Sequence, residues 1–368
     1  MVKSAYIHIP FCEKICSYCD FCKMFYNEEL VNKYLEELSL EIDNSYNNEL
    51  LDTIYIGGGT PSSLNIKQLN KLLDITNKFK LNDNYEFTIE CNFENITHEK
   101  LDLFKKAGIN RLSFGLESIN KNNLEILDRT ISKEKVIDTI NYCHKIGFHN
   151  INIDIMYAIK NETLEILQED INFIKTLDIT HISTYSLIIE KNTKLYIKKC
   201  DYIDEDLDRK MYDLICHELK DFDHYEISNF AKKKEYRSKH NQAYWKNLEY
   251  YGFGLGSSGY EGNVRYEKTR SINKYLNHDY IKDNGIEFLT NKDKIYYEII
   301  LNLRTKEGID LIEFKNKYKN NLEYYYNYKD LLYKNYLVKK NNHIFIPENL
   351  YYTSNTIIIQ LLEGEKDE

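Results

Sequence analysis

The chain of 368 residues is long enough for one large α/β domain with a smaller appendage, or for two domains. Hydrophobic residues make up 42% of it and aromatic residues 14%, which allows a sizeable core and argues against wholesale disorder. The formal net charge of −9 offers no electrostatic footprint for nucleic acid, and no run of about 18 apolar residues predicts a membrane-spanning helix.

Six short runs of β-branched or aromatic residues recur in the first half of the chain, separated by segments of helical periodicity. The runs lie at 5–9, 53–56, 86–90, 111–115, 150–155 and 181–187. The helical segments include 28–42, 66–79, 133–146 and 164–176. This alternation predicts repeated βαβ units, and therefore a parallel sheet with helices outside it. Six strands favour an α/β fold of the partial (β/α)6 barrel type over a closed barrel of eight.

The second half of the chain is less regular. Residues 201–250 combine a helical segment with mixed patterns, and a glycine-rich stretch follows at 252–262. From about residue 291, helical segments alternate with short strands at 336–340 and 343–346, which resembles a small helical or winged-helix domain. We therefore expect a barrel core at 1–200, a barrel extension at 201–290 and a mainly helical C-terminal domain at 291–368.

The stretches that follow the first four expected strands are candidates for function. They lie at 10–22, 57–62, 91–92 and 115–118, and they resemble a hydrophobic core least of any part of the first half. In parallel α/β folds the chemistry lies at the carboxyl ends of the strands. We expect these stretches to converge on one rim.

Four of the eight cysteines fall between residues 12 and 22. The N-terminus shows no signal peptide, so we expect a reducing cytoplasm and metal binding in place of a disulfide framework. Cys12, Cys16 and Cys19 can hold three irons of a 4Fe-4S cluster and leave the fourth iron open for S-adenosylmethionine. The alternative is a structural zinc ion with Cys22 as fourth ligand. We favour the cluster, with Cys22 as a bystander thiol.

Three glycines and a proline lie within residues 57–61, directly after the second expected strand. Glycine lets the backbone approach a ligand closely and expose its N–H groups. The segment therefore predicts a ligand-binding turn, and the alternative is a tight connection between a strand and a helix.

The segment from Tyr6 to Cys12 (YIHIPFC), followed by Cys16 to Phe21 (CSYCDF), resembles the coproporphyrinogen III oxidase branch of the radical-SAM superfamily. The similarity extends through nearly the whole chain. It implies a radical-SAM barrel that binds a 4Fe-4S cluster and S-adenosylmethionine. The cofactor-binding residues that it implies, besides the three cysteines, are Tyr6, Tyr18, Gly58, Gly59, Thr60, Glu90, Glu117, Arg129 and Asp154.

The resemblance also implies roles for some of these residues. The glycine turn is expected to contact the methionyl part of the cofactor, Arg129 its carboxylate and Asp154 the adenosine ribose. Three positions depart from the family's pattern. Phe93 replaces a proline, residues 158–160 replace Gly-Leu-Pro, and Glu117 replaces a glutamine, which loses an amide donor and adds a charge.

This branch contains oxygen-independent oxidases that decarboxylate coproporphyrinogen III, and haem chaperones of the HemW type that bind haem and pass it on. Three features favour the chaperones. The first cysteine is already Cys12, whereas oxidases carry a long segment ahead of the cluster. Asp20 and Phe21 follow the third cysteine where oxidases have Gly-Cys. The segment 240–245 (HNQAYW) matches the chaperone motif His-Asn-x-x-Tyr-Trp.

The resemblance therefore implies haem as a further cofactor, near His240, Tyr244 and Trp245. An imidazole can ligate haem iron, and aromatic faces can stack on a porphyrin. A buried core histidine beside packed aromatics is the alternative. The leading hypothesis is a cytoplasmic haem chaperone that serves acceptor haemoproteins, which include membrane proteins, and that can form a homodimer. An active coproporphyrinogen oxidase, or another radical-SAM enzyme with a vestigial haem motif, are the other two.

Overall fold

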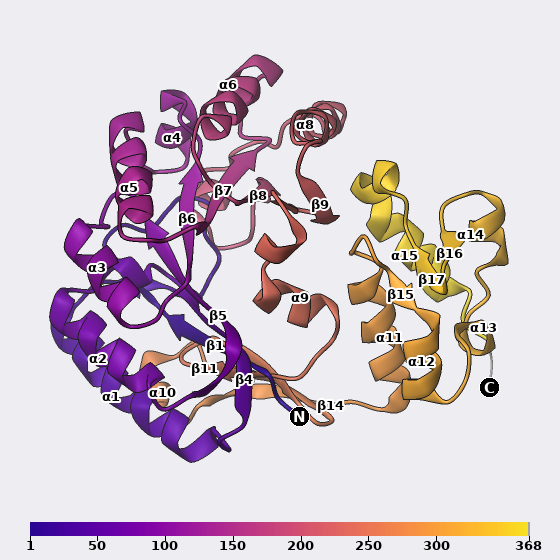
Figure 1. The fold of residues 1–368 in the computed structure, drawn as a ribbon, viewed down its shortest axis with the longest axis horizontal. Helices are drawn as coiled ribbons and strands as arrows, with labels where there is room; N and C mark the ends of the chain where they lie inside the picture. Colours follow the sequence, from indigo (N-terminus) through magenta and orange to yellow (C-terminus); the bar gives the residue numbers. More distant parts are fainter. Residues whose placement is uncertain (367–368) are drawn as a thin grey trace.

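The structure is a computed structural model that describes residues 1–366. Its centre is a curved sheet of six parallel strands, each hydrogen-bonded to the next along the chain (Figure 1). The strands are β1 (Ser4–Ile9), β4 (Leu50–Gly58), β5 (Lys80–Asn92), β6 (Arg111–Glu117), β7 (Asn150–Tyr157) and β8 (His181–Ser186). The expected partial (β/α)6 barrel is thereby confirmed.

Helices follow the strands and cover the outer face of the sheet (Figure 1). They are α1 (Glu28–Ser45), α2 (Ile66–Thr76), α3 (His98–Lys106), α4 (Lys121–Ile126), α5 (Lys133–Lys145), α6 (Leu164–Lys175) and α8 (Glu205–Glu218). The short α7 (Lys194–Ile197) lies against the loop at Ser17 instead, where Leu195 N donates to Ser17 O. Side-chain N-caps fix where they begin. Asn65, for example, forms a capping box with Gln68 at the start of α2. Because apolar residues of the strands face these helices, the barrel interior is left to polar side chains.

β4 and β5 begin several residues earlier than the sequence predicted. β5 begins at Lys80, six residues before the expected start, and β4 begins at Leu50. The extra residues pair with each other, Leu50 with Lys80 and Leu51 with Leu81, and a register shift separates them from the barrel strands. These segments have little β-branched character, so only their mutual pairing identifies them as strands.

The part from about residue 200 to 290 widens the same sheet at both edges. Beside β8 lie β10 (Asn229–Ala231) and β9 (Asp223–Glu226), and beside β1 lies β11 (Tyr250–Phe253), which is parallel to it. The antiparallel strands β12 (Ser258–Glu261), β13 (Val264–Lys268) and β14 (Ile281–Phe288) continue from β11, with α10 (Ile272–Leu276) between the last two. The short helix α9 (Lys239–Trp245) lies on the concave side of the sheet (Figure 1).

The C-terminal part is mainly helical, as expected, with a small antiparallel sheet (Figure 1). The sheet contains β15 (Ile309–Asp310), β16 (Val338–Lys340) and β17 (His343–Phe345). The helices are α11 (Asn291–Asn302), α12 (Leu311–Tyr318), α13 (Leu322–Tyr325), α14 (Lys329–Tyr333) and α15 (Ser354–Glu363). One continuous apolar core runs from Val2 to Leu361, so the domain boundaries at 200 and 290 stay predictions.

A buried ion pair joins α1 to the widened sheet. Lys268 Nζ of β13 lies 2.8 Å from Glu41 Oε1, and both side chains are buried. Glu41 Oε2 accepts hydrogen bonds from the Tyr275 hydroxyl at 2.6 Å and from the Gly254 N–H at 2.8 Å. One carboxylate therefore connects four separate segments of the chain.

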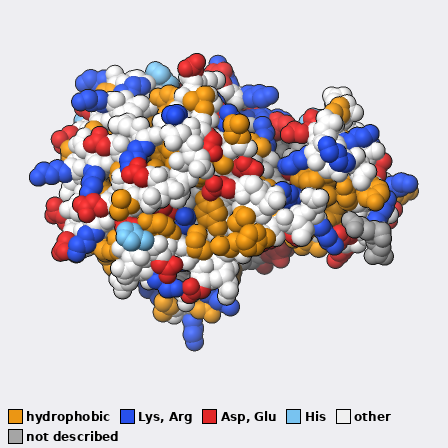
Figure 2. All heavy atoms as spheres, turned by 90° about the horizontal axis from the view of Figure 1, so that it is seen from below, with side chains coloured by type: hydrophobic (Ala, Val, Ile, Leu, Met, Phe, Trp, Pro, Cys, Tyr) orange, Lys and Arg blue, Asp and Glu red, His pale blue; other side chains and the backbone are white. Residues whose placement is uncertain are grey.

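The underside of the molecule mixes apolar and charged groups. Figure 2 shows hydrophobic side chains gathered near the middle of this face, with acidic and basic side chains interspersed around them. Among residues 1–366, no helix combines the length and the apolar character needed to cross a membrane.

Candidate functional site

A pocket at the carboxyl ends of the barrel strands collects most of the predicted cofactor residues. The predicted residues that line it are Cys12, Cys16, Tyr18, Cys19, Gly58, Gly59, Thr60, Glu90, Glu117, Arg129 and Asp154. They come from six separate segments of the sequence, which the parallel topology brings to the expected rim. Asn92, Ser113 and Gly115 complete the same wall.

The three cysteines lie in a loop that spans the mouth of the barrel. Ser17 anchors the loop, because its hydroxyl donates to Ile126 O at 2.6 Å and its carbonyl accepts from Leu195 N at 3.0 Å. Burial raises the pKa of Cys12 to about 11 and that of Cys16 to about 12. The thiols therefore hold their protons at neutral pH, and a metal or cluster that binds them as thiolates displaces those protons.

The glycine turn between β4 and α2 packs directly against this loop. Gly58 adopts a φ of 117°, and its N–H donates to Glu90 Oε2 at 2.9 Å. A Cβ atom at position 59 would lie 2.9 Å from Cys12 Sγ, so no larger residue fits there without displacing the cysteine. Thr60 Oγ1 lies 3.5 Å from the same sulfur. The turn is therefore shaped by the cysteine that it faces.

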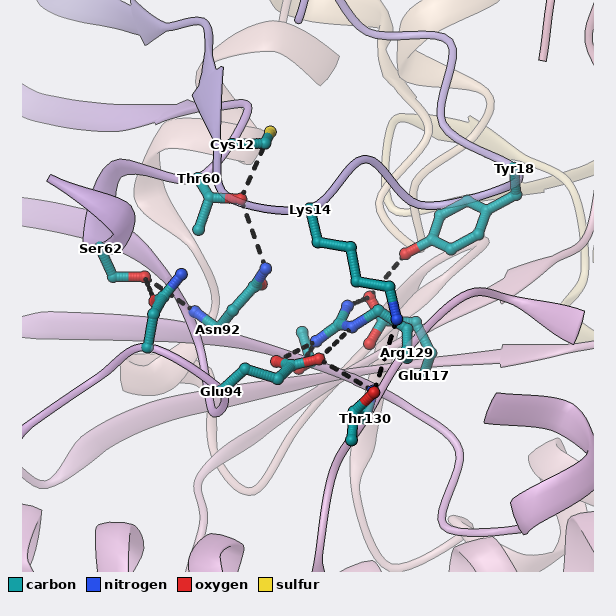
Figure 3. A network of polar contacts seen from close by, with 12 residues as sticks. Cys12, Lys14, Tyr18, Thr60, Ser62, Asn92, Glu94, Glu117, Arg129 and Thr130 are labelled. Atoms are coloured by element: carbon teal, nitrogen blue, oxygen red, sulfur yellow. Dashed lines mark hydrogen bonds and ion pairs between the residues drawn. The ribbon is translucent and has the colours of Figure 1, made fainter. Parts of the chain in front are cut away.

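Arg129 is the centre of a polar network on the opposite wall (Figure 3). Its Nε lies 2.7 Å from Glu94 Oε1, and its Nη1 lies 2.7 Å from Glu117 Oε1, which also accepts from the Tyr18 hydroxyl at 2.8 Å. The charge that Glu117 adds is thus balanced by Arg129. Burial raises the pKa of Glu117 to about 6, and its Oε2 is buried without a hydrogen-bond partner within residues 1–366.

Glu94 was not predicted from the sequence. The only signal for it is its position two residues after Asn92, on the segment that leaves the rim after β5. An isolated glutamate in such a segment is indistinguishable from a solvent-exposed one, and its role depends on the distant Arg129.

Two further carboxylates form the floor of the pocket. Glu90 accepts from the Tyr55 hydroxyl at 2.8 Å as well as from Gly58 N, and Asp154 accepts from Asn152 Nδ2 at 2.8 Å. Burial raises the pKa of Glu90 to about 7 and also raises that of Asp154. These groups can accept hydrogen bonds from the amino and hydroxyl groups of a ligand.

Tyr6 and Cys22 lie away from this pocket. The Tyr6 hydroxyl donates to His8 Nδ1 at 3.0 Å, and His8 Nε2 donates to the carbonyl of Cys22 at 2.6 Å. The Tyr6 ring lies inside the barrel, 6.1 Å from that of Tyr55 between centroids. Cys22 packs against Gly256 as part of the apolar core.

The motif at 240–245 forms α9, and its side chains divide between two places. His240 is 1% exposed, with Nδ1 2.7 Å from Thr53 Oγ1 and Nε2 2.8 Å from the Tyr244 hydroxyl. Its ring stacks on Tyr55 inside the barrel at 5.1 Å. Trp245 instead lines an open groove of about 350 Å³ between α9 and the C-terminal part, together with His343. His240 can therefore ligate a metal only after one of its two hydrogen bonds is broken.

Comparison with known proteins shows to which family the chain belongs. The model of the radical SAM superfamily matches residues 6–174. The heme chaperone HemW of Bacillus subtilis is 38% identical over 338 residues, which cover 88% of each chain, and that of Lactococcus lactis is 37% identical over 88% and 87%. The chain belongs to the HemW family.

The fold of this HemW family member also matches a solved structure. Coproporphyrinogen III oxidase (HemN) of Escherichia coli superimposes with a TM-score of 0.85 over 97% of this chain and 89% of that one, at 19% identity. At that identity the likeness establishes the shared radical-SAM fold and leaves the activity undetermined.

The rim pocket has the donor set that a 4Fe-4S cluster with S-adenosylmethionine requires. Three thiols line one side, a glycine turn with a close backbone approach lies beside them, and the unpartnered Glu117 Oε2 and the floor carboxylates offer acceptors. Within residues 1–366, no three His, Cys, Asp or Glu side chains are spaced as ligands of one single metal ion. The three thiols fit the cluster, whose irons are held by separate cysteines.

The buried His8 predicts sensitivity to acid. Burial lowers the pKa of His8 to about 4, so between about pH 6.5 and pH 4 the unfolded chain binds a proton there that the folded chain does not. The stability that the neutral ring contributes is present above pH 6.5 and is lost as the pH falls. We expect His8→Gln to reduce the slope of the unfolding free energy against pH by about 1.4 kcal/mol per pH unit in this window.

Urea unfolding of the cluster-free protein at several pH values measures this slope. His217→Gln is the matched control, because the His217 ring is exposed to solvent. Equal slopes for wild type and His8→Gln would show that His8 is protonated in the folded state.

Proposed function

We propose that this protein is a haem chaperone, which binds haem and passes it to acceptor haemoproteins, and which holds a 4Fe-4S cluster and S-adenosylmethionine in the rim pocket. The observation that carries the proposal is the similarity to HemW chaperones over 88% of the chain, which includes the α9 motif. We further propose a cytoplasmic location, supported by eight cysteines that are all free thiols. Homodimer formation and membrane-bound acceptors belong to the same proposal.

Each wall of the rim pocket has a distinct part in this proposal. Cys12, Cys16 and Cys19 would hold the cluster, whose open iron supplies the electron and the coordination site for S-adenosylmethionine when bound. The glycine turn would present backbone N–H groups to the methionyl part. Arg129, which its ion pairs with Glu94 and Glu117 hold in place, would attract the carboxylate of S-adenosylmethionine. Asp154 would accept a hydrogen bond from the ribose.

The α9 region is where we propose that haem binds. The groove beside Trp245 is open, and its indole can stack on a porphyrin face, whereas the imidazole of His240 lies behind the Tyr244 hydroxyl. Breaking that hydrogen bond frees Nε2, and burial keeps the ring neutral by lowering the pKa of His240 to about 3. A neutral imidazole is the form that binds iron.

Haemin titration and a decarboxylation assay test the proposed function together. We expect a saturable change in the Soret band, and no decarboxylation of coproporphyrinogen III by the cluster-loaded protein with S-adenosylmethionine under anaerobic, reducing conditions. Turnover would establish the oxidase instead. If the protein shows neither saturable haem binding nor turnover, it is a radical-SAM enzyme of another specificity and the proposed function is wrong.

Single substitutions locate the haem site. We expect Trp245→Ala and His240→Ala each to weaken haem binding by about tenfold or more, since each removes a contact of roughly 1.4 kcal/mol or more. The absorbance of the 4Fe-4S cluster should be unchanged in both. His343→Ala is the control within the same groove. If it abolishes haem binding while His240→Ala does not, the groove is the site and His343 is the iron ligand.

A further inference from the structure

Among residues 1–366, Arg111 is a buried cation of the barrel interior without a direct partner. It begins β6 and is 2% exposed. Its Nε has no hydrogen-bond partner, and its guanidinium forms no ion pair with any side chain of residues 1–366. A guanidinium stays protonated in proteins, so this position carries a permanent charge.

The other buried cations of residues 1–366 are all paired. Arg129 contacts Glu94 and Glu117, Lys268 contacts Glu41, and Arg237 lies 2.6 Å from carboxylate oxygens of Asp223 and Glu307. An unpaired buried charge is costly, whereas a purely structural cation is stabilised by a partner. The isolation of Arg111 is therefore an exception within this molecule that calls for a functional reason.

Strand register places Arg111 directly beneath the rim pocket. It pairs with Thr88 of β5, and Ser113, two residues further on, pairs with Glu90. Residues two apart on a strand share a face, so Arg111 and Ser113 point to the same side. Ser113, Glu90 and Asp154 line the pocket. The guanidinium thus lies one layer of side chains below the pocket floor.

The ionisable groups around Arg111 form two sets. Glu90 and Asp154 lie above it, and its charge acts against the rise in pKa that burial causes in both. Below it, Glu86 already accepts from three groups at the start of α9, the N–H groups of Lys239 and His240 and the Ser238 hydroxyl. Tyr55, Tyr225, His181 and His240 are neutral neighbours on the remaining sides. Only the upper carboxylates face the pocket.

We propose that Arg111 is a positioning residue of the cofactor site, whose unpaired charge keeps Glu90 and Asp154 as carboxylates that can bind the amino and hydroxyl groups of S-adenosylmethionine. A direct salt bridge would turn these carboxylates away from the pocket and occupy their oxygens. A cation one layer below attracts them without using their lone pairs. The identity of the ligand rests on the function proposed above, whereas the effect of the charge on the carboxylates does not.

The cluster-free protein tests the effect of the charge alone. In Arg111→Met, the pKa of Glu90 and Asp154 should rise further, so the folded state keeps protons to a higher pH than in wild type. A carboxyl group whose pKa is raised in the folded state makes the free energy of unfolding fall as the pH rises. In Arg111→Met this fall should therefore continue to a pH about one unit or more higher than in wild type. Arg111→Lys keeps the charge and should follow the wild-type profile. Both profiles come from urea unfolding between pH 5 and about pH 9.

The cluster-loaded protein tests the link to the ligand. We expect Arg111→Met to bind S-adenosylmethionine about tenfold or more weakly at pH 7, with affinity restored above pH 8, and Arg111→Lys to retain most of the affinity. A structural role predicts instead that both variants lose stability equally at every pH and that the pH profile of binding does not move, which would overturn the proposal. If Arg111→Met does not fold, a shifted profile in Arg111→Lys would overturn it as well. If wild type binds no S-adenosylmethionine, the proposed function fails, and the cluster-free profiles still decide the role of Arg111.

Discussion

Replacing Cys16 by alanine is expected to abolish iron binding after anaerobic reconstitution and to eliminate binding of S-adenosylmethionine. The physical reason is that three sulfurs hold three irons, and the loss of one leaves two irons of the cubane without protein ligands. Cys16 lines the rim pocket in a loop that Ser17 anchors, so the substitution removes a sulfur without removing a buried packing group of the barrel. Iron and sulfide analysis, with the visible absorbance of the cluster, measures the result.

Cys22→Ser is the matched control for this experiment. Cys22 belongs to the same short segment but lies in the apolar core beside Gly256, so its replacement should leave the iron content unchanged. If Cys22→Ser also loses the metal, and the wild type binds one zinc ion in place of iron, the site is a four-cysteine zinc site and the cluster assignment is wrong.

Replacing Glu41 by alanine is expected to destabilise the fold by about 3–5 kcal/mol, because it leaves Lys268 buried without its partner. The same carboxylate accepts hydrogen bonds from Tyr275 and Gly254, so the loss extends to four segments. Urea unfolding of the cluster-free protein at neutral pH measures the change.

Two further variants separate the buried charge from other causes. Glu36→Ala removes an exposed ion pair with Lys71 from the same helix, and it should cost less than about 1 kcal/mol. The double variant Glu41→Leu/Lys268→Met should recover much of the stability, since no charge then remains buried. A double variant as unstable as Glu41→Ala would show that the hydrogen bonds, and not the ion pair, carry the effect.

The sequence was sufficient for the parallel barrel and for most of the rim pocket. β-branched runs at regular spacing predict the order of the strands, and parallel order brings the cysteine loop and the glycine turn to one rim. Motif spacing thus predicts which residues meet when each lies at the end of a strand. The family resemblance, and not the spacing, implied Glu90, Arg129 and Asp154, and the structure places them in the same pocket.

The partners inside the barrel could not be predicted in this way. His240 was singled out as a haem residue, yet nothing in its neighbourhood in the sequence indicates that Thr53 occupies its Nδ1, 187 positions away. The same holds for Glu94, whose role depends on its ion pair with Arg129. It also holds for Arg111, because the sequence does not indicate that its Nε lacks a hydrogen-bond partner in the folded chain. Such features depend on long-range register, which local patterns leave undetermined.

The helix α9 also has a consequence for how the two ends of the barrel communicate. It is seven residues long, and it presents Trp245 to the outer groove and His240 to Tyr55, whose hydroxyl holds Glu90 at the pocket floor. A ligand that displaces this helix from the groove side also disturbs the contact that leads to Glu90. Thermodynamic linkage then requires reciprocity, so that occupancy of the rim pocket changes affinity in the groove by the same factor.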